Sequence, residues 1–433
     1  MAERYTTVGV GLMGLGTVGT GVYKLLSRHD WLNVCRIAVR HPNQKREIVD
    51  LDTNLLTTDP FEVVRDENVR LVVEVMGGLE PAKDLVLEAL RLGKHVVTAN
   101  KALIATHGEL LFQTARDNNA CILFEGAVAG GIPIIQPLKL SLAANRVQEI
   151  AGILNGTTNY ILTRMSQDGW EYDQALAEAQ ARGFAEADPT NDVDGFDTAY
   201  KISILSSIAF QTRVDPAQLS VEGIRSISAK DITLARELGY GIKLIGLARA
   251  AQNGAIDARV HPMLVPLDHP LASIHHEYNA VWIQGDAVGD VMFSGKGAGE
   301  MPTASAVVAD ILAIGNDLHT DNPTPVPGMR VQFNGQALLQ PVSDTQNRYY
   351  IRLNTRDVPG VIGDLGHCCG AAGVSLESVM QKGITLDANG QIKTAAIILI
   401  TQMVYEHQLQ DALNRIRQLE TTGSVGCVLR VLG

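Results

Sequence analysis

The glycine-rich segment "GVGLMGLGTVG" constrains the fold more than any other part of the sequence. It holds Gly14-x-Gly16-x-x-Gly19 between an apolar run, "VGVGLM", and a stretch with helical spacing, "VGTGVYKLLSRH". Between a strand and a helix, such glycines allow a tight turn and let the backbone approach a pyrophosphate at the helix N-terminus. The overlapping match from Gly9 to Gly14 would cut the strand short. The residues predicted to contact a dinucleotide here are Gly14, Gly16, Thr17, Val18 and Gly19.

The end of the second predicted strand bears on the choice of dinucleotide. An NAD-specific site places an acidic residue about 20 residues after the glycines, where it binds the ribose 2′-hydroxyl. Here Arg40 stands in the corresponding place, in "IAVRHPNQKRE", and Lys45 and Arg46 follow. A guanidinium suits a 2′-phosphate, so NADP is favoured and NAD stays possible. The alternative interpretation of this stretch is a solvated basic loop.

Strands and helices alternate through the first third of the chain, which predicts an α/β fold with a Rossmann-type doubly wound parallel sheet. At 433 residues the chain is long enough for two or three domains. We place the dinucleotide-binding domain at residues 1–130 and a second α/β domain at 131–299. A long helix at 300–322 is expected to pack back onto the first domain. The polar, proline-bearing stretch 323–348 is expected to be a linker.

Composition excludes several classes of protein. The formal net charge is −11, which argues against non-specific nucleic-acid binding. No stretch reaches the roughly 18 apolar residues of a membrane helix. We therefore expect a cytoplasmic protein, although an organelle protein whose transit peptide has been removed would look the same. The five cysteines are odd in number and form no CxxC, which disfavours a disulfide framework or a zinc site. The adjacent Cys368–Cys369 is interpreted as helix packing, with a redox switch as the alternative.

An acidic run ends on a single lysine. The run "GFAEADPTNDVDGFDTAYK" is followed by the uncharged "ISILSSIAFQT", so Lys201 is the only charge between residues 198 and 212. If Asp194 caps a helix and Asp197 lies in its first turn, Asp197 and Lys201 are i,i+4 neighbours. A surface salt bridge would contribute under about 1 kcal/mol. A buried lysine, with its pKa lowered by desolvation and raised again by the carboxylate, could instead transfer protons.

Several motifs resemble those of a known family. The segments "NGTTNYIL", "TANKAL" and "GAGEMPTASAV" occur in the order found in homoserine dehydrogenases, and the resemblance covers about residues 5–320. The signature of that family is matched by Ala179-x-x-x-Gly183-Phe-Ala, Asp188-Pro189 and Asp192-Val193-x-Gly195-x-Asp197-x-x-x-Lys201. The resemblance implies interconversion of L-homoserine and L-aspartate 4-semialdehyde with NAD(P)(H), in the threonine and methionine branch of amino-acid biosynthesis.

The resemblance also assigns roles by position. Lys201 would give or take the proton at the C4 oxygen of the substrate, with Asp197 as its partner, and Lys101 would approach the nicotinamide and the reacting carbon. The domain at 131–299 would bind the substrate and pair subunits into a homodimer or homotetramer. The substrate contacts implied are Glu186, Asp192 and Asp197. The further cofactor contacts implied are Lys101, Gly183 and Gly299.

A sodium ion is a further implication of the resemblance. In the family a carboxylate and backbone oxygens hold it, and "EGAVAGGI" places these at Glu125, Val128, Gly130 and Ile132. Oxygen ligands suit a hard cation. Without the resemblance, the same segment is interpreted as a glycine-rich turn.

The last segment, residues 349–433, has the predicted order β-α-β-β-α-β, a split βαβ module that can fold alone. With its "RDVPGV" turn it resembles an ACT regulatory domain. The resemblance implies an amino-acid effector, with threonine expected as a product of the pathway, contacted by Asp357 and Gly360. The alternative is a simple dimerisation module.

Two other functions compete with the dehydrogenase. An acylating semialdehyde dehydrogenase needs a nucleophilic cysteine, but Cys35 and Cys121 lie in apolar, strand-like runs. A ligand-sensing protein with a vestigial cofactor domain would not need the complete glycine loop or the Asp197–Lys201 pair. Absorbance at the NADPH band during incubation with homoserine distinguishes the three.

Overall fold

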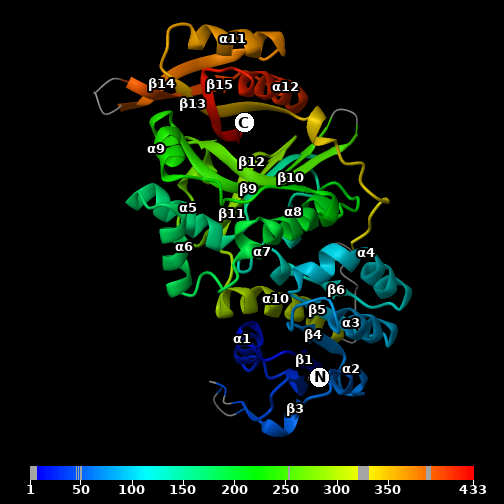
Figure 1. Ribbon diagram of the computed structural model, residues 1–433. Helices are drawn as coiled ribbons and strands as arrows, with labels where there is room; N and C mark the ends of the chain where they lie inside the picture. Colours follow the sequence, from blue (N-terminus) through cyan, green and yellow to red (C-terminus); the bar gives the residue numbers. More distant parts are fainter. Residues whose placement is uncertain are drawn as a thin grey trace.

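The N-terminal third of the chain forms a six-stranded parallel sheet at one end of the computed structural model (Figure 1). The structure describes residues 7–44, 46, 48, 51–251, 254–319, 331–386 and 392–433. The strand order is β3-β2-β1-β4-β5-β6, the order of a Rossmann fold, so the expected doubly wound sheet is confirmed. The strands are β1 Val8–Met13, β2 Leu32–Ala38, β3 Leu56–Thr57, β4 Leu71–Glu74, β5 His95–Thr98 and β6 Ile122–Leu123.

Helices cover both faces of this sheet, because its strands are apolar on both sides. Val8, Val10 and Leu12 of β1 face a core that includes residues of α1 (Thr17–Leu26) and α10 (Glu300–His319). Met13 faces the opposite core, which α2 (Pro60–Arg65), α3 (Ala82–Arg91) and α4 (Lys101–Asp117) complete. Helix α10 thus returns from residue 300 to pack against α1.

The second sheet has eleven strands and forms the upper body in Figure 1. Its first part has the order β12-β11-β7-β9-β10. These strands are β7 Val147–Ile153, β9 Tyr240–Ala250, β10 Ile256–Pro266, β11 Tyr278–Gly285 and β12 Gly289–Lys296, and the short β8, Ser220–Val221, pairs with β10. The helices of this part are α5 Gly156–Asp168, α6 Tyr172–Ala181, α7 Thr190–Val193, α8 Phe196–Ala209 and α9 Ala229–Glu237.

Helix α8 lies close against β9 because β9 has a glycine at the contact. A Cβ on Gly246 would come within 3.0 Å of Thr198 and 3.1 Å of Ile202. Helix α8 also contacts β7, β10 and α4. It is therefore enclosed by the second sheet on one side and by the first domain on the other, which explains why it has no charged solvent face.

The C-terminal segment has the expected element order β-α-β-β-α-β, interrupted by the short β16 (Val404–Tyr405). Its strands lie in the order β17-β13-β15-β14. Their bounds are β13 Gln346–Arg356, β14 Leu376–Leu386, β15 Ile392–Thr401 and β17 Thr422–Val431. The helices are α11 Val361–Ala371, in which Cys368 and Cys369 are buried, and α12 Glu406–Arg417.

This segment has its own core, but it also contacts the second domain in a way that the sequence analysis did not predict. Strand β17 pairs in parallel with β10, so the two parts share one continuous sheet. Arg352 of β13 forms an ion pair at 2.6 Å with the buried Asp231 of α9. Strand β13 begins at Gln346, so the predicted boundary at 349 falls inside a strand. Of the predicted linker, residues 323–330 lie outside the described residues.

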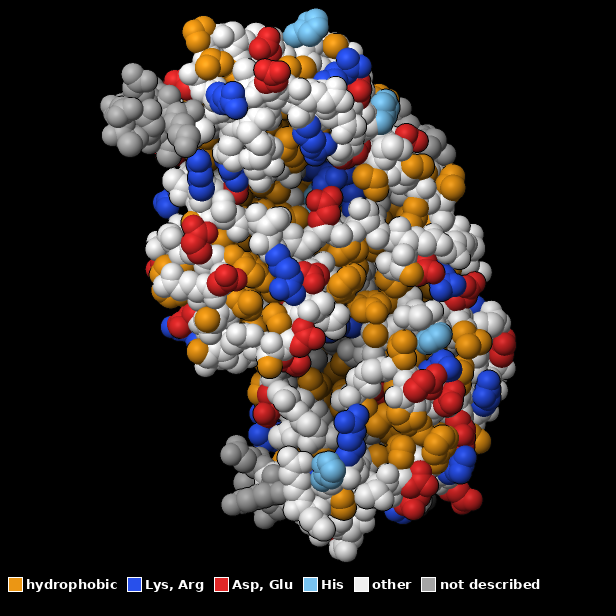
Figure 2. Space-filling model, in the orientation of Figure 1, with side chains coloured by type: hydrophobic (Ala, Val, Ile, Leu, Met, Phe, Trp, Pro, Cys, Tyr) orange, Lys and Arg blue, Asp and Glu red, His pale blue; other side chains and the backbone are white. Residues whose placement is uncertain are grey.

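The surface carries charged side chains of both signs. On the face shown in Figure 2, Lys and Arg side chains lie interspersed with Asp and Glu, and the outline narrows between the two bodies. In the described part of the chain, no helix is long and apolar enough to cross a membrane.

Candidate active site

Helix α8 places Asp197 in its first turn, as predicted, but the predicted cap is wrong. The residue before the helix is Gly195, which has φ +90°, a conformation that favours glycine. A Cβ there would also lie 3.0 Å from Val221. This sharp turn from α7 into α8 directs Asp194 elsewhere, and its carboxylate pairs with Arg225 at 2.5 Å.

Asp197 bridges two lysines that come from different domains. Its Oδ2 accepts a hydrogen bond from Lys201 Nζ at 2.7 Å, which confirms the i,i+4 pair. Its Oδ1 lies 2.7 Å from Nζ of Lys101, the first residue of α4. Asp197 and Lys201 are buried, whereas the side chain of Lys101 is 39% exposed. The cluster therefore has one buried lysine and one lysine whose side chain is partly exposed.

Backbone and amide groups fix this cluster in place. Lys201 Nζ also donates to the carbonyl of Leu154, at 2.7 Å. Asn155 caps α5, where its Oδ1 accepts from the backbone N–H of Thr158. The Nδ2 of Asn155 donates to Asp197 Oδ2 at 2.9 Å and to Asp192 Oδ1 at 2.7 Å. The cap thus brings the predicted substrate residue Asp192 beside the lysine pair.

Asn155 is a site residue to which the sequence analysis gave no role, although it opens the motif "NGTTNYIL". An Asn before a helical run is a typical N-cap, so its place at a helix start could have been predicted. Its second role, holding two carboxylates, depends on packing between α5 and α7 and has no signal in the local sequence.

The charges in the cluster shift one another's pKa. Burial alone would raise the pKa of Asp197, but the charges of Lys201 and Lys101 lower it below its usual range. Burial lowers the pKa of Lys201, and the charge of Asp197 acts in the opposite direction. The charge of Asp197 raises the pKa of Lys101. Burial raises the pKa of Asp192. Lys201 is thus the amine that loses its proton more readily, as a proton-transferring group requires.

The glycine loop adopts the predicted geometry. Gly14 has φ +104°, and a Cβ on Gly19 would lie 2.1 Å from the carbonyl oxygen of Gly14, so neither position accepts a side chain without rearrangement. Gly16 caps α1, which places Thr17, Val18 and Gly19 in the first helical turn. The N–H groups of that turn form a site for an anion.

A pocket of about 500 Å³ opens beside this loop. Its wall includes Gly14 and Gly16, and from the chain that follows β2 it includes Arg40 and Arg46. The guanidinium of Arg46 donates to the backbone carbonyls of His41, Pro42 and Gln44. Arg40 is exposed. Lys45 lies outside the described residues.

Other predicted residues lie apart from the lysine cluster. Gly183 and Glu186 are exposed between α6 and α7. Among the described residues, no hydrogen bond joins the Glu186 side chain to the cluster, and its backbone oxygen accepts from Gln180. Gly299, with φ +124°, precedes α10. The roles of these three residues stay predictions.

Glu125 is buried at the end of β6, and its carboxylate has protein donors. It accepts backbone N–H groups of Ile134, Ile135 and Gln136 at 2.5–2.8 Å. The following turn carries Val128, Gly130 and Ile132 past Gly297, whose carbonyl oxygen would lie 2.4 Å from a Cβ on Gly130. Among the described residues, no group of three or more His, Cys, Asp or Glu side chains could hold a metal.

Comparisons with known proteins agree on one family. The family model "Homoserine dehydrogenase, NAD binding domain" matches residues 14–125, and "Homoserine dehydrogenase" matches residues 133–312. A homoserine dehydrogenase of Synechocystis sp. is 45% identical over 438 residues, covering 98% of this chain and 100% of that protein.

Solved structures give the same result. The crystal structure of a homoserine dehydrogenase from Thiobacillus denitrificans has a TM-score of 0.88 and 39% identity, covering 98% of each chain. A hyperthermophilic archaeal homoserine dehydrogenase in complex with NADPH has a TM-score of 0.61 and 29% identity, covering 73% of this chain and 99% of that one. At such identity and coverage, with the Asp197 cluster and the glycine loop in place, the chain belongs to the homoserine dehydrogenase family.

Proposed function

We propose that the protein interconverts L-homoserine and L-aspartate 4-semialdehyde with NADP(H), and that Lys201 is its proton-transfer group. The observation that carries the proposal is the bridge of Asp197 to one buried and one half-exposed lysine. A nicotinamide, when bound, supplies the hydride acceptor or donor at the substrate carbon. The reaction also needs a group that gives or takes the proton of the substrate C4 oxygen. It further needs a positive charge that stabilises the negative charge developing on that oxygen.

Lys201 has the bonding pattern of an acid–base group. An ammonium has three N–H donors, and Lys201 directs two of them to Asp197 and to the Leu154 carbonyl. The third position on the Lys201 nitrogen carries a proton when the amine is charged and a lone pair when it is neutral. In the oxidation of homoserine the lone pair takes the hydroxyl proton as hydride leaves C4. In the reduction the ammonium returns that proton.

Lys101 complements Lys201 at the reacting oxygen. Because Asp197 raises its pKa, Lys101 keeps its charge when Lys201 does not. A fixed cation near the oxygen stabilises the negative charge that develops there during hydride transfer. Asp192, and Glu186 as the resemblance implies, would bind the substrate ammonium.

The test of the function is a direct assay. Purified protein, incubated with L-homoserine and NADP⁺, is expected to raise the absorbance of the NADPH band. Omission of homoserine is the control. No homoserine-dependent signal with either NADP⁺ or NAD⁺ would overturn the proposed function.

We also propose that Arg40 favours NADP over NAD. Arg40 lines the pocket beside the glycine loop, where a guanidinium would pair with a 2′-phosphate. An Arg40→Glu variant should lose about tenfold or more in kcat/KM with NADP⁺ while its kcat/KM with NAD⁺ holds or rises. Arg36→Glu, in β2 four residues before Arg40 and paired with Glu62 and Asp66, is the matched control. Unchanged cofactor preference in the Arg40 variant would show that the loop is merely solvated.

A sodium ion at Glu125 is a further part of the proposal. Burial raises the pKa of Glu125, and burial with the charge of Glu125 raises the pKa of Asp310 to about 7. The charge of Lys139 already lowers the pKa of both acids. A hard cation held by carboxylate and backbone oxygens would add a second positive charge beside them. Glu125, Val128, Gly130 and Ile132 would hold it, and its charge would order the turn.

Sodium should therefore raise the melting temperature by about 2 °C or more relative to choline at equal ionic strength. Glu125→Gln should abolish the difference, while Glu109→Gln, an exposed acid on α4, should retain it. Equal melting temperatures in the two salts would contradict the sodium site.

We propose that the C-terminal segment binds threonine as an ACT-type regulator. A pocket of about 460 Å³ lies at the "RDVPGV" turn, and Asp357 and Gly360 line it. Gln381 Nε2 donates to Asp357 Oδ1 at 2.9 Å, which holds the carboxylate at the rim. A carboxylate and the N-terminal turn of α11, which begins at Val361, suit the two charged ends of an amino acid.

Asp357→Ala should raise the threonine concentration needed for half-inhibition about tenfold, since a charged hydrogen bond is lost. Asp364→Ala, an exposed acid of the first turn of α11, should behave as wild type. Equal inhibition in all three proteins would favour a simple pairing role for this segment.

The competing enzyme has little support. An acylating dehydrogenase needs a thiolate near pH 7, but burial raises the pKa of Cys35. Its Sγ lies near the carbonyl oxygens of Asn33 and Asn68, which disfavour a thiolate.

A further inference from the structure

Helices α4 and α8 pack against each other and carry the lysine cluster at one end of their contact. Lys101 is the first residue of α4, and Asp197 lies in the first turn of α8. Further along, Gly108 of α4 and Ile208 of α8 line one small pocket. At about 1.5 Å per residue, this pocket lies roughly 10 Å along each helix from the lysines. The cluster and the pocket are thus two ends of a single seam between the two domains.

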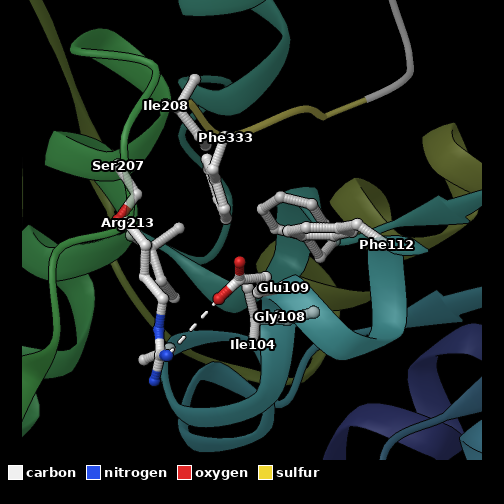
Figure 3. A pocket seen from close by; sticks show the side chains of 11 residues that line it. Ile104, Gly108, Glu109, Phe112, Ser207, Ile208, Arg213 and Phe333 are labelled. Atoms are coloured by element: carbon white, nitrogen blue, oxygen red, sulfur yellow. Dashed lines mark hydrogen bonds and ion pairs between the residues drawn. The ribbon is translucent and has the colours of Figure 1, made fainter. Parts of the chain in front are cut away.

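Phe333 closes the far end of the seam. Figure 3 shows its side chain extending between α8 and Phe112 of α4. The rings of Phe333 and Phe112 meet edge to face, with centroids 5.6 Å apart, and Phe112 packs in turn on Phe124 at 5.4 Å. The space left is about 10 Å³, no more than one water needs. The ring therefore fills a gap that the two helices would otherwise leave or close by shifting.

The segment around Phe333 is fastened to both domains. On the side of α4, Arg116 Nη1 donates to the carbonyl of Val331 at 2.8 Å. On the side of α8, the chain just after the helix runs beside the segment as a short ladder. Its backbone hydrogen bonds, each 2.8 Å long, are Asn334 N to Gln211 O, Arg213 N to Gly335 O and Ala337 N to Arg213 O.

Arg213 extends this connection across the seam. Its guanidinium pairs with Glu109 of α4 (Figure 3). It also donates to the backbone carbonyl of Thr106, on the same helix. The segment 331–337 is therefore held by α4, holds the chain that follows α8, and inserts an aromatic ring between them.

We infer that segment 331–337 is a clamp that sets the spacing of α4 and α8, and that Phe333 is a positioning residue for Lys101. The inference rests on the proposed function. The Lys101–Asp197 contact is the polar bridge between the two helices at the site. Lys101 is half-exposed, so its position depends on where α4 lies. A misplacement of about 1 Å at such a group can cost up to about 10²-fold in rate.

The test compares Phe333→Ala with Leu338→Ala in the full chain. Leu338 belongs to the same stretch but is 69% exposed, so its removal deletes apolar surface without opening the seam. Phe333→Ala should lower kcat for homoserine oxidation about tenfold, with the Kd for NADP⁺ unchanged within about twofold. Phe333→Leu, which refills most of the gap, should recover most of the rate.

The pH dependence of homoserine oxidation distinguishes a displaced Lys101 from generally looser packing of the protein. Four charged groups act on one another here: Lys101 from α4, Asp197 and Lys201 from α8, and Asp192 from α7. If Lys101 moves away, Lys201 keeps Asp197 and loses a neighbouring positive charge. The pH at which homoserine oxidation reaches half its maximum should therefore rise in Phe333→Ala.

A Phe333→Ala protein with the kcat and pH profile of Leu338→Ala would overturn the inference. Should that variant not fold, Arg116→Gln, which loses the bond to Val331, carries the same test, with a smaller loss and the same direction of shift expected. An unchanged profile there would also overturn it. Wild-type protein is assayed alongside, so absence of activity in wild type would instead count against the proposed function.

Discussion

Lys201→Ala is expected to lower kcat by about 10²–10⁴-fold in both directions of the reaction. The variant removes the group that holds the proton, while Asp197 keeps Lys101 as a partner, so the carboxylate is not left without a counter-charge. The glycine loop belongs to the other domain and should bind NADPH as before. Steady-state kinetics with homoserine and fluorescence titration with NADPH measure the two effects.

Lys243→Ala is the matched control for Lys201→Ala. Lys243 is a second buried lysine, whose pKa burial lowers to about 8, and it donates to Asn159 Oδ1 at 3.0 Å. Its loss should reduce the free energy of unfolding and leave kcat of the folded protein within about threefold. If both variants lost turnover equally, or if Lys201→Ala kept near-normal turnover, the assignment of proton transfer to Lys201 would be wrong.

The parts of the site that could be predicted from residue patterns are local. The i,i+4 pair of Asp197 and Lys201 follows from helix geometry, and the positions of Gly14 and Gly19 follow from a turn that bulky residues cannot make. Lys101 shows where such reasoning ends. It is 96 positions before Asp197 in the chain, so its contact depends on how α4 packs against α8, and only the family resemblance placed it in the site.

Local sequence patterns gave a wrong N-cap for α8 and gave no sign of how the C-terminal segment pairs with β10. Asp is among the preferred N-cap residues, but the N-cap of α8 is Gly195, in a tight turn. The carboxylate of Asp194 instead forms an ion pair with Arg225. The C-terminal segment has its own core and a complete element order, so its pattern indicates independence. Its pairing with β10 uses backbone groups of a strand edge, and its ion pair to Asp231 uses one arginine. Neither changes the hydrophobic periodicity from which a domain boundary is predicted.

Asp197→Asn is expected to have the second large effect, because it leaves two amines without their shared carboxylate. An uncompensated buried charge costs about 3–5 kcal/mol, and Lys201 can avoid that cost by losing its proton. The free energy of unfolding should fall by a few kcal/mol at most for this reason. The rate should fall about 10²-fold, since Lys101 and Lys201 no longer share an anchor.

The direction of the pH shift identifies the cause of that loss. In the wild type the charge of Asp197 raises the pKa of Lys201 against burial. Without it the pKa of Lys201 falls, so the rise of homoserine oxidation with pH and the decline of semialdehyde reduction with pH should both move to lower pH. Loose packing alone would lower both rates without moving either profile.

Asp194→Asn is the control that shows whether the effect depends on the buried carboxylate of Asp197. Asp194 lies three residues away, but its pair with Arg225 is partly exposed, and such pairs contribute under about 1 kcal/mol. That variant should keep its rate and both pH profiles. Profiles that stay in place in Asp197→Asn, or that shift equally in Asp194→Asn, would mean that Asp197 does not set the charge of Lys201. The lysine would then have to be tuned by burial alone, and Lys101 would lose its assigned place beside the reacting oxygen.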